Sequence, residues 1–157
     1  MFIAKNNNLI ILAKDTREEL ERALQLMQYT DIEETDIDYQ LYNGQYLTPK
    51  EIAQQEAERI AQLHLTRGDV FRGLLLAKGV TRTQLRAIIE QMPEETPEQK
   101  IAKEYALIDF DEALDFYRGV ALIDRVGKKL DITPEQMTKF FETNDWHKLV
   151  NDNNGND

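Results

Sequence analysis

The sequence predicts an α+β fold in which a small N-terminal ββαββ lobe packs on a C-terminal region of several helices without strands. Short apolar runs separated by turn-forming residues fill the first 47 positions, whereas Thr-Pro helix starts recur from Thr48 onward. Hydrophobic residues make up 41% of the 157 residues, which is enough to bury a core. We therefore expect an α+β lobe over 1–47, a helical domain over 48–147 and a disordered polar tail over 148–157.

The strands of the N-terminal lobe follow from apolar runs and turn residues. Residues 2–5 (FIAK) and 9–13 (LIILA) flank an asparagine run, and asparagine tolerates the positive φ of a hairpin turn. Asn43-Gly44 lies between two β-prone runs and is the strongest hairpin signal in the chain. A further short strand fits near residues 29–33. Because fewer than 50 residues make a marginal core alone, we expect this sheet to pack on the helix that follows it.

The helix inside this lobe begins in the segment DTREELERALQLMQ. Asp15 is a suitable N-cap, and Glu18 stands three residues later, as in a capping box. The expected buried face consists of Leu20, Leu24 and Met27.

The helices of the C-terminal region are marked by repeated cap chemistry. A threonine caps, a proline takes the first helical position and Glu or Gln completes the capping box at Thr48–Glu51, Thr96–Gln99 and Thr133–Gln136. Thr81–Gln84 is a fourth box without proline. The predicted helices are 49–64, 69–78, 82–92, 97–108, 111–118, 120–130 and 134–142. Their expected buried faces include Leu85, Ile88, Ile89 and Met92, then Ile101, Tyr105 and Ile108, and finally Met137, Phe140 and Phe141.

The chain is acidic, with 29 acidic and 19 basic side chains and a formal charge of −10. This balance repels phosphate backbones and anionic lipid surfaces, which argues against nucleic-acid and membrane partners. The charges are uneven, because Arg67–Ala87 holds five basic residues and one acidic residue, whereas Ile88–Val126 holds ten acidic and four basic residues. No apolar run reaches the roughly 18–20 residues of a membrane span, and the start MFIAKNNN does not resemble a signal peptide.

The segment Leu74–Ile89 (LLLAKGVTRTQLRAII) has the local pattern of a DNA-binding helix-turn-helix. Gly79 supplies the turn, and the second helix would present Arg82 and Arg86. Leu75, however, occupies the place where a small residue usually lets the two helices cross closely. The alternative is a helix corner whose basic side chains lie in solvent or pair with the acidic stretch, and the overall acidity favours it.

The sequence contains few of the residue types and motifs that form catalytic sites. The chain has no cysteine and no serine, its only histidines are His64 and His147, and it has no phosphate-binding glycine loop. We interpret His64 as the C-terminal residue of a helix. The densest carboxylate cluster is Asp109, Asp111, Glu112 and Asp115. It lacks the spacing of a calcium loop and is better explained as charges at the start of a short helix, with Phe110, Leu114 and Tyr117 facing inward. We expect no catalytic residue, no metal and no cofactor.

Side chains that suit protein contacts occur in three places. The β-hairpin carries Tyr39, Tyr42 and Tyr46, and the basic segment carries Arg72, Arg82 and Arg86. Trp146 follows the last helix, where it either forms part of a docking surface or closes the core. We favour core closure for Trp146.

Three passages together suggest a family. They are MFIAKNNNLIILAKDTREELERAL, LTRGDVFRGLLLAKGVTRTQLRAII and LIDFDEALDFYRGVALIDRVGKKLDITPEQMTKFF. In these passages the chain resembles uncharacterised small proteins encoded in bacterial prophages, often in regions that carry tail genes. The resemblance implies a prophage setting, in the host cytoplasm or the virion, and a protein that binds other phage-encoded proteins. It carries no catalytic or ligand-binding residues.

Three functional hypotheses remain open at this stage. The leading one is a non-enzymatic phage accessory protein that acts in tail assembly or as a minor virion component. The second is an inhibitor of a host nucleic-acid enzyme that mimics DNA with its acidic stretch Glu90–Asp115. The third is a DNA-binding regulator that uses Leu74–Ile89.

Overall fold

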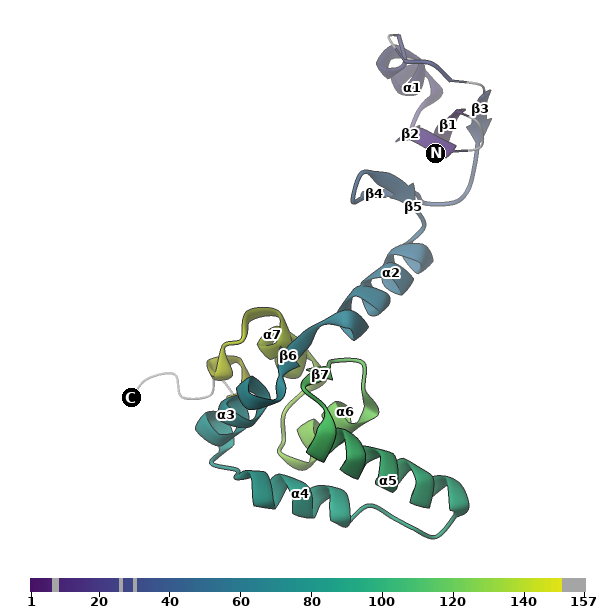
Figure 1. Ribbon diagram of the computed structural model, residues 1–157. Coiled ribbons are helices and arrows are strands. Elements are labelled where there is room, and N and C mark those ends of the chain that lie inside the picture. Colours follow the sequence, from purple (N-terminus) through teal and green to yellow (C-terminus); the bar gives the residue numbers. More distant parts are fainter. Residues whose placement is uncertain (7–8, 26, 30, 151–157) are drawn as a thin grey trace. The chain divides into compact units, whose positions relative to one another are not determined.

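The chain forms two compact units, Met1–Glu58 and Arg59–Asp157. The computed structural model describes residues 1–6, 9–25, 27–29 and 31–150 (Figure 1). Short antiparallel sheets precede a set of helices, so the α+β class predicted from the sequence is confirmed. The division between the units falls inside helix α2 (Pro49–Gln62) and not at residue 47. Tyr42 donates a hydrogen bond to Glu56 before that point, whereas Gly119 donates one to the Ala61 carbonyl after it.

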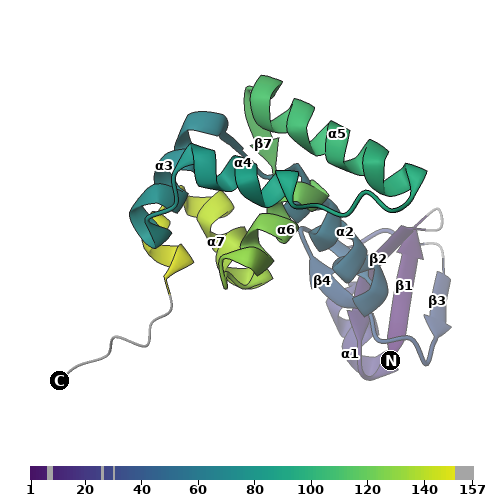
Figure 2. The same cartoon turned by 90° about the horizontal axis from the view of Figure 1, so that it is seen from below.

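The N-terminal unit is built around a three-stranded antiparallel sheet. Strand β1 (Phe2–Asn6) lies between β2 (Leu9–Lys14) and β3 (Asp31–Glu34), as Figure 2 shows. Ile3 opposes Ala13 on one neighbour and Ala4 opposes Ile32 on the other. The antiparallel pairing predicted for the first hairpin and the short strand expected near residues 29–33 are both confirmed, whereas the predicted asparagine turn at residues 7–8 lies outside the described residues.

Helix α1 (Arg17–Ala23) supplies the core of this unit. Leu20 and Leu24 are buried, as predicted, and they pack with Ala4 of β1. The N-cap prediction was wrong, because Thr16 and not Asp15 accepts the hydrogen bond from the helix, at 3.2 Å from the Glu19 nitrogen. Met27 is exposed because the helix ends before reaching it.

The expected packing of the sheet on the following helix is not found. The sheet packs on α1, and α2 has no buried residue along its described length. Strands β4 (Gln40–Tyr42) and β5 (Gln45–Leu47) form the predicted hairpin. Asn43 and Gly44 have φ values of 49° and 80°, as a two-residue turn with both central residues left-handed requires.

Five further α-helices lie in residues 59–150, the described part of the C-terminal unit. They are α3 (Arg67–Lys78), α4 (Arg82–Glu90), α5 (Pro97–Glu112), α6 (Ala121–Lys129) and α7 (Pro134–Thr143). The capping boxes predicted at Thr81, Thr96 and Thr133 are all formed. The core of the unit includes Val70, Leu74, Leu85, Ile89, Met92, Phe110, Phe116, Ile123, Met137, Phe140 and Phe141.

The C-terminal region is not all-helical, which corrects three predictions. Strand β6 (His64–Thr66) pairs with β7 (Asp115–Tyr117) where the sequence predicted helix 111–118. Helix α5 continues to Glu112, and Ala113 then takes an extended conformation with ψ of 136°. His64 therefore lies in a strand and not at a helix end, and its ring lies 5.3 Å from that of Tyr117.

The burial predicted around this strand was partly wrong. Phe110 is buried as expected, but Leu114 is 80% exposed and Tyr117 is 44% exposed. The core residue of β7 is Phe116. In a strand, side chains alternate between two faces, so Phe116 and Tyr117 cannot both point inward.

Arg118 is a buried charged residue that sequence reasoning did not identify. Its guanidinium donates hydrogen bonds to Asp124 at 2.6 Å, to the Thr138 hydroxyl at 3.1 Å and to the Pro134 carbonyl at 3.2 Å. Because the three acceptors come from α6 and α7, one side chain fixes the end of β7 to both helices.

The chain remains ordered past residue 147, contrary to the predicted tail. A 3₁₀ turn, η1 (Trp146–Leu149), follows α7, and Leu149 is fully buried. The burial of this leucine contradicts the prediction that residues 148–150 belong to a disordered tail. The remaining part of the predicted tail, 151–157, lies outside the described residues.

Candidate protein-binding surfaces

The segment Leu74–Ile89 forms the helix, glycine turn and second helix that both interpretations of the sequence require. Gly79 ends α3 with a φ of 66°, and Thr81 caps α4. Leu75 points outward with 48% of its surface exposed, and α4 packs on α5 and α6. The corner is thus part of the fold of the C-terminal unit.

Two basic side chains of this corner converge on one carboxylate. Arg82 lies 3.3 Å from the Asp111 carboxylate, and Arg86 binds its other oxygen and also Glu90 at 3.0 Å. The hydrogen bond from Arg86 holds the pKa of Asp111 below its usual value, and the same bond raises the pKa of Arg86. Both arginines are therefore already paired with the acidic stretch of the chain.

The environment of this cluster extends beyond the ion pairs. Arg67 donates a hydrogen bond to the backbone carbonyl of Asp111. The Arg82 guanidinium lies 5.6 Å from the Phe110 ring centre and 5.7 Å from that of Phe71, within cation–π range. Sequence reasoning predicted Asp111 at a helix start, whereas it lies in the last turn of α5. A carboxylate there opposes the helix dipole, and the arginines offset that cost.

Arg72 and Trp146 come together at a second place. They line a pocket of about 190 Å³ with Asp69, Gly73, Leu76, Phe140 and Asn144. Arg72 pairs with Asp69 at 2.6 Å, and hydrogen bonds from Thr66 and then Arg72 lower the pKa of that carboxyl group. Trp146 is half-buried and stacks on His147 with ring centres 3.8 Å apart. The pocket is small and its charges are paired.

The three tyrosines of the hairpin do not form one surface. Leu41 opposes Tyr46 and Tyr42 opposes Gln45, so Tyr42 and Tyr46 point to opposite faces of the two-stranded ribbon. The Tyr42 hydroxyl is bound to Glu56 at 2.8 Å. These tyrosines are each half-buried.

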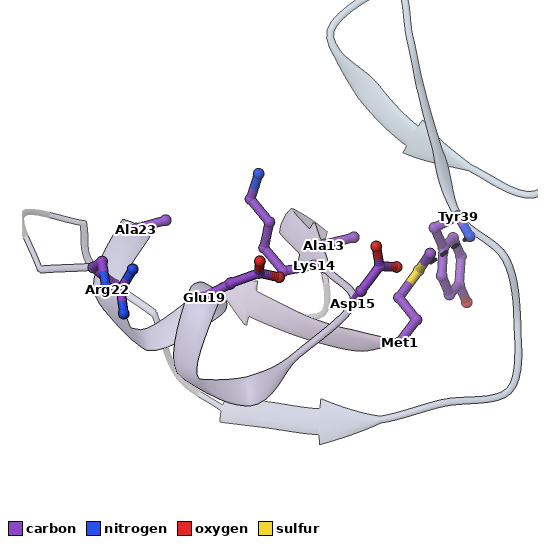
Figure 3. A pocket seen from close by; sticks show the side chains of 8 residues that line it. All are labelled: Met1, Ala13, Lys14, Asp15, Glu19, Arg22, Ala23 and Tyr39. Atoms are coloured by element: carbon purple, nitrogen blue, oxygen red, sulfur yellow. Dashed lines mark hydrogen bonds between the residues drawn. The ribbon is translucent and has the colours of Figure 1, made fainter.

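Tyr39 lies at a separate, open pocket of about 570 Å³ (Figure 3). Its backbone nitrogen donates to the Met1 sulfur at 3.4 Å. The charged side chains at this pocket are Lys14, Asp15, Glu19 and Arg22. This mixture of exposed charges of both signs selects no ligand class.

The strongest surface feature was predicted as core. Ile101, Tyr105 and Ile108 were expected to face inward, but they are 54%, 65% and 53% exposed. The buried residues of α5 are Ala106 and Phe110, on the opposite side of the helix. Helix α5 has apolar residues on both faces, so periodicity alone could not select the buried one. We call Ile101, Tyr105 and Ile108 the α5 stripe.

Carboxylates flank the α5 stripe. At 100° per residue, Glu104 lies on one side of the stripe, Asp109 lies on the other, and Glu112 continues the stripe toward the C-terminal end of α5. All three are exposed, and none forms an ion pair within the described part of the chain. We call Glu104, Asp109 and Glu112 the acidic rim. Asp109 and Glu112 stand in the last turn, where the helix dipole disfavours negative charge and no arginine offsets it.

The rest of the described chain shows little that suggests a chemical site. Across residues 1–6, 9–25, 27–29 and 31–150, no three His, Asp or Glu side chains are grouped to hold a metal ion. In the same residues, every buried side-chain nitrogen and oxygen has a hydrogen-bond partner, and no helix is long and apolar enough to span a bilayer. Comparison with known proteins finds no family model, no curated protein and no solved structure that matches the chain.

Proposed function

We propose that this is a non-enzymatic accessory protein that acts by binding another protein through the α5 stripe. The exposure of three large apolar side chains along one well-formed helix carries the proposal. Isolated exposed apolar residues are common on protein surfaces, but a contiguous set bordered by charged residues is typical of a protein contact. Tyrosine is also among the residues that contribute most to such contacts.

The setting that we propose is a bacteriophage, with a role in tail assembly or as a minor virion component. This part of the proposal rests on the resemblance of three sequence passages to prophage-encoded proteins. The partner is then a phage-encoded protein, and the host cytoplasm or the assembled particle is where the contact forms.

The DNA-mimic hypothesis draws support from the unpaired carboxylates of the acidic rim. Mimicry needs a ridge of negative charge, however, and here the centre of the surface is apolar over three side chains. The helix-turn-helix hypothesis requires Arg82 and Arg86 to leave Asp111 before they could contact phosphate. We therefore rank both below a protein contact.

Comparative capture from an induced lysogen tests this function. The full-length protein is compared with a double stripe variant, Tyr105→Ser with Ile108→Ser, and with Leu114→Ser as a control that removes an exposed leucine outside the stripe. We expect the wild type and the control to recover the same phage tail or assembly protein, and the double stripe variant to lose it. Equal recovery by all three proteins, or recovery of no phage structural protein, would contradict the proposal.

A further inference from the structure

We infer that the occupant of the α5 stripe is an amphipathic helix with basic flanks, supplied by a different protein. This inference rests on the proposed function and specifies the chemistry of the partner. It follows from the shape of the stripe, the unpaired charges of the acidic rim and the cost of placing a second copy there.

The shape of the stripe favours a helical partner. Ile101, Tyr105 and Ile108 stand at positions i, i+4 and i+7 and form a convex ridge about 10 Å long. The backbone groups of α5 are bonded within the helix, so an added β-strand would find no free N–H or C=O groups. A second helix laid alongside can place its own apolar ridge against these side chains, as helices do when they pack.

The charges of the acidic rim select the flanks of that helix. A partner that covers the stripe also removes water from Glu104, Asp109 and Glu112. Desolvating a carboxylate without a counter-charge is costly, whereas Lys or Arg side chains on both flanks of the partner would offset that cost. Asp111 shows the same chemistry within the chain, because Arg82 and Arg86 offset its position at the end of α5.

A second copy of the protein does not provide those flanks. If two α5 stripes faced each other, the acidic rims of both copies would be brought together, and like charges across an interface are destabilising. The formal charge of −10 on each copy adds a long-range repulsion. The partner is therefore a different, basic segment.

Binding of designed helical peptides to the full-length protein tests this inference. The probes are a peptide with an apolar face and Lys/Arg flanks, the same peptide with Glu flanks, and a scrambled peptide with the composition of the first. We expect binding of the first peptide alone, with a dissociation constant that rises as salt is added, because rim charges are screened. Fluorescence anisotropy of the labelled peptides provides the measurement.

Matched variants measure separately how much the α5 stripe and the acidic rim contribute to peptide binding. We expect the double stripe variant to raise the dissociation constant at least about tenfold. A triple rim variant, Glu104→Gln with Asp109→Asn and Glu112→Gln, is expected to raise it about threefold or more and to weaken its salt dependence. Leu114→Ser and Glu135→Gln, which change exposed residues outside the stripe and rim, should leave it unchanged. Fluorescence of Trp146, the single tryptophan, and circular dichroism verify that each variant is folded.

Several outcomes would overturn the inference. Equal binding of the basic and scrambled peptides would show that basic peptides bind this acidic protein through charge alone, without contacting the α5 stripe. Binding of the acidic-flanked peptide, or a dimer in sedimentation that the double stripe variant abolishes, would assign the surface to another occupant. If capture from the lysogen depends on the stripe but the basic peptide does not bind, the proposed function stands and this inference fails. If the peptide binds but capture does not depend on the stripe, the proposed function fails.

Discussion

Asp111 joins the basic and acidic parts of the sequence within the C-terminal unit. Arg82 and Arg86 both contact its carboxylate, and the hydrogen bond from Arg86 keeps its pKa below the usual value. A carboxyl group with a lower pKa in the folded state stabilises the fold above its unfolded pKa of about 3.9. That stabilisation is lost as the pH falls from about 3.9 through the folded pKa.

The first prediction concerns the pH dependence of this carboxylate. Asp111→Asn should lower the urea midpoint at about pH 7, because the two arginines lose their counter-charge, and the difference from wild type should shrink toward about pH 3. Trp146 fluorescence provides the measurement, since this tryptophan lies in the same unit. Asp109→Asn is the matched control on the same helix, and a loss as large as that of Asp111→Asn would contradict the assignment.

The second prediction concerns the close approach of the Phe140 ring to helix α3 at Gly73. A Cβ atom at Gly73 would lie 2.4 Å from the Phe140 ring, so Gly73→Ala should destabilise the unit by about 1–3 kcal/mol. In an open helix the same change would stabilise by about 1 kcal/mol, so the sign of the effect is diagnostic. At Gly68, on the same helix, the nearest atom is the Thr66 hydroxyl oxygen at 3.8 Å, which makes Gly68→Ala the control. A Gly73→Ala protein as stable as that control would show that the contact can relax.

At the scale of elements, the third prediction tests the connection that Arg118 makes between β7, α6 and α7. Arg118→Met removes three hydrogen bonds from a buried position and should destabilise the unit by about 2–4 kcal/mol. Arg125→Met, on the exposed side of α6, should change stability much less. Urea unfolding followed by Trp146 fluorescence compares the two. Similar losses in both variants would mean that the hydrogen bonds of Arg118 contribute little.

Helices and strands were predictable from the sequence where interactions between residues close together in the chain determine them. Thr81, Thr96 and Thr133 cap their helices through side chains within three positions of each other, so the pattern alone identified them. Strand β7 was missed because it is stabilised by pairing with residues 64–66, far away in the sequence. The exposed face of α5 was missed because tertiary packing on Ala106 and Phe110 selects which of two apolar faces is buried.

The same reasons explain which site residues were found. The sequence identified Arg82 and Arg86 as exceptional in an acidic chain. Their common partner Asp111 lies 29 and 25 residues later, respectively, and was assigned to a helix start. Arg72 and Trp146 were proposed separately and line one pocket. The α5 stripe is visible in the sequence as a periodic apolar set. One sequence signal distinguishes it from a core face: carboxylates border it on both sides.

At the scale of the whole molecule, the charges divide into those that are paired within the C-terminal unit and those of the acidic rim, which form no ion pair in the described part of the chain. Arg72, Arg82 and Arg86 are each paired with a carboxylate of the same unit, so these three arginines contribute to the fold of the C-terminal unit. The acidic rim flanks the exposed α5 stripe on both sides and continues at its C-terminal end. Exposed apolar side chains and unpaired carboxylates at a helix C-terminus do not stabilise the fold, and such locally unfavourable groups are common at binding surfaces.

Site-specific photo-crosslinking tests the central claim most directly. A photoreactive phenylalanine analogue replaces Tyr105 in the α5 stripe, or Leu114 outside it, in the full-length protein expressed during phage induction. We predict a discrete adduct with one phage-encoded protein from position 105, and no such adduct from position 114. Adducts of equal yield from both positions, or none from position 105, would contradict the claim that the α5 stripe is the protein-binding surface.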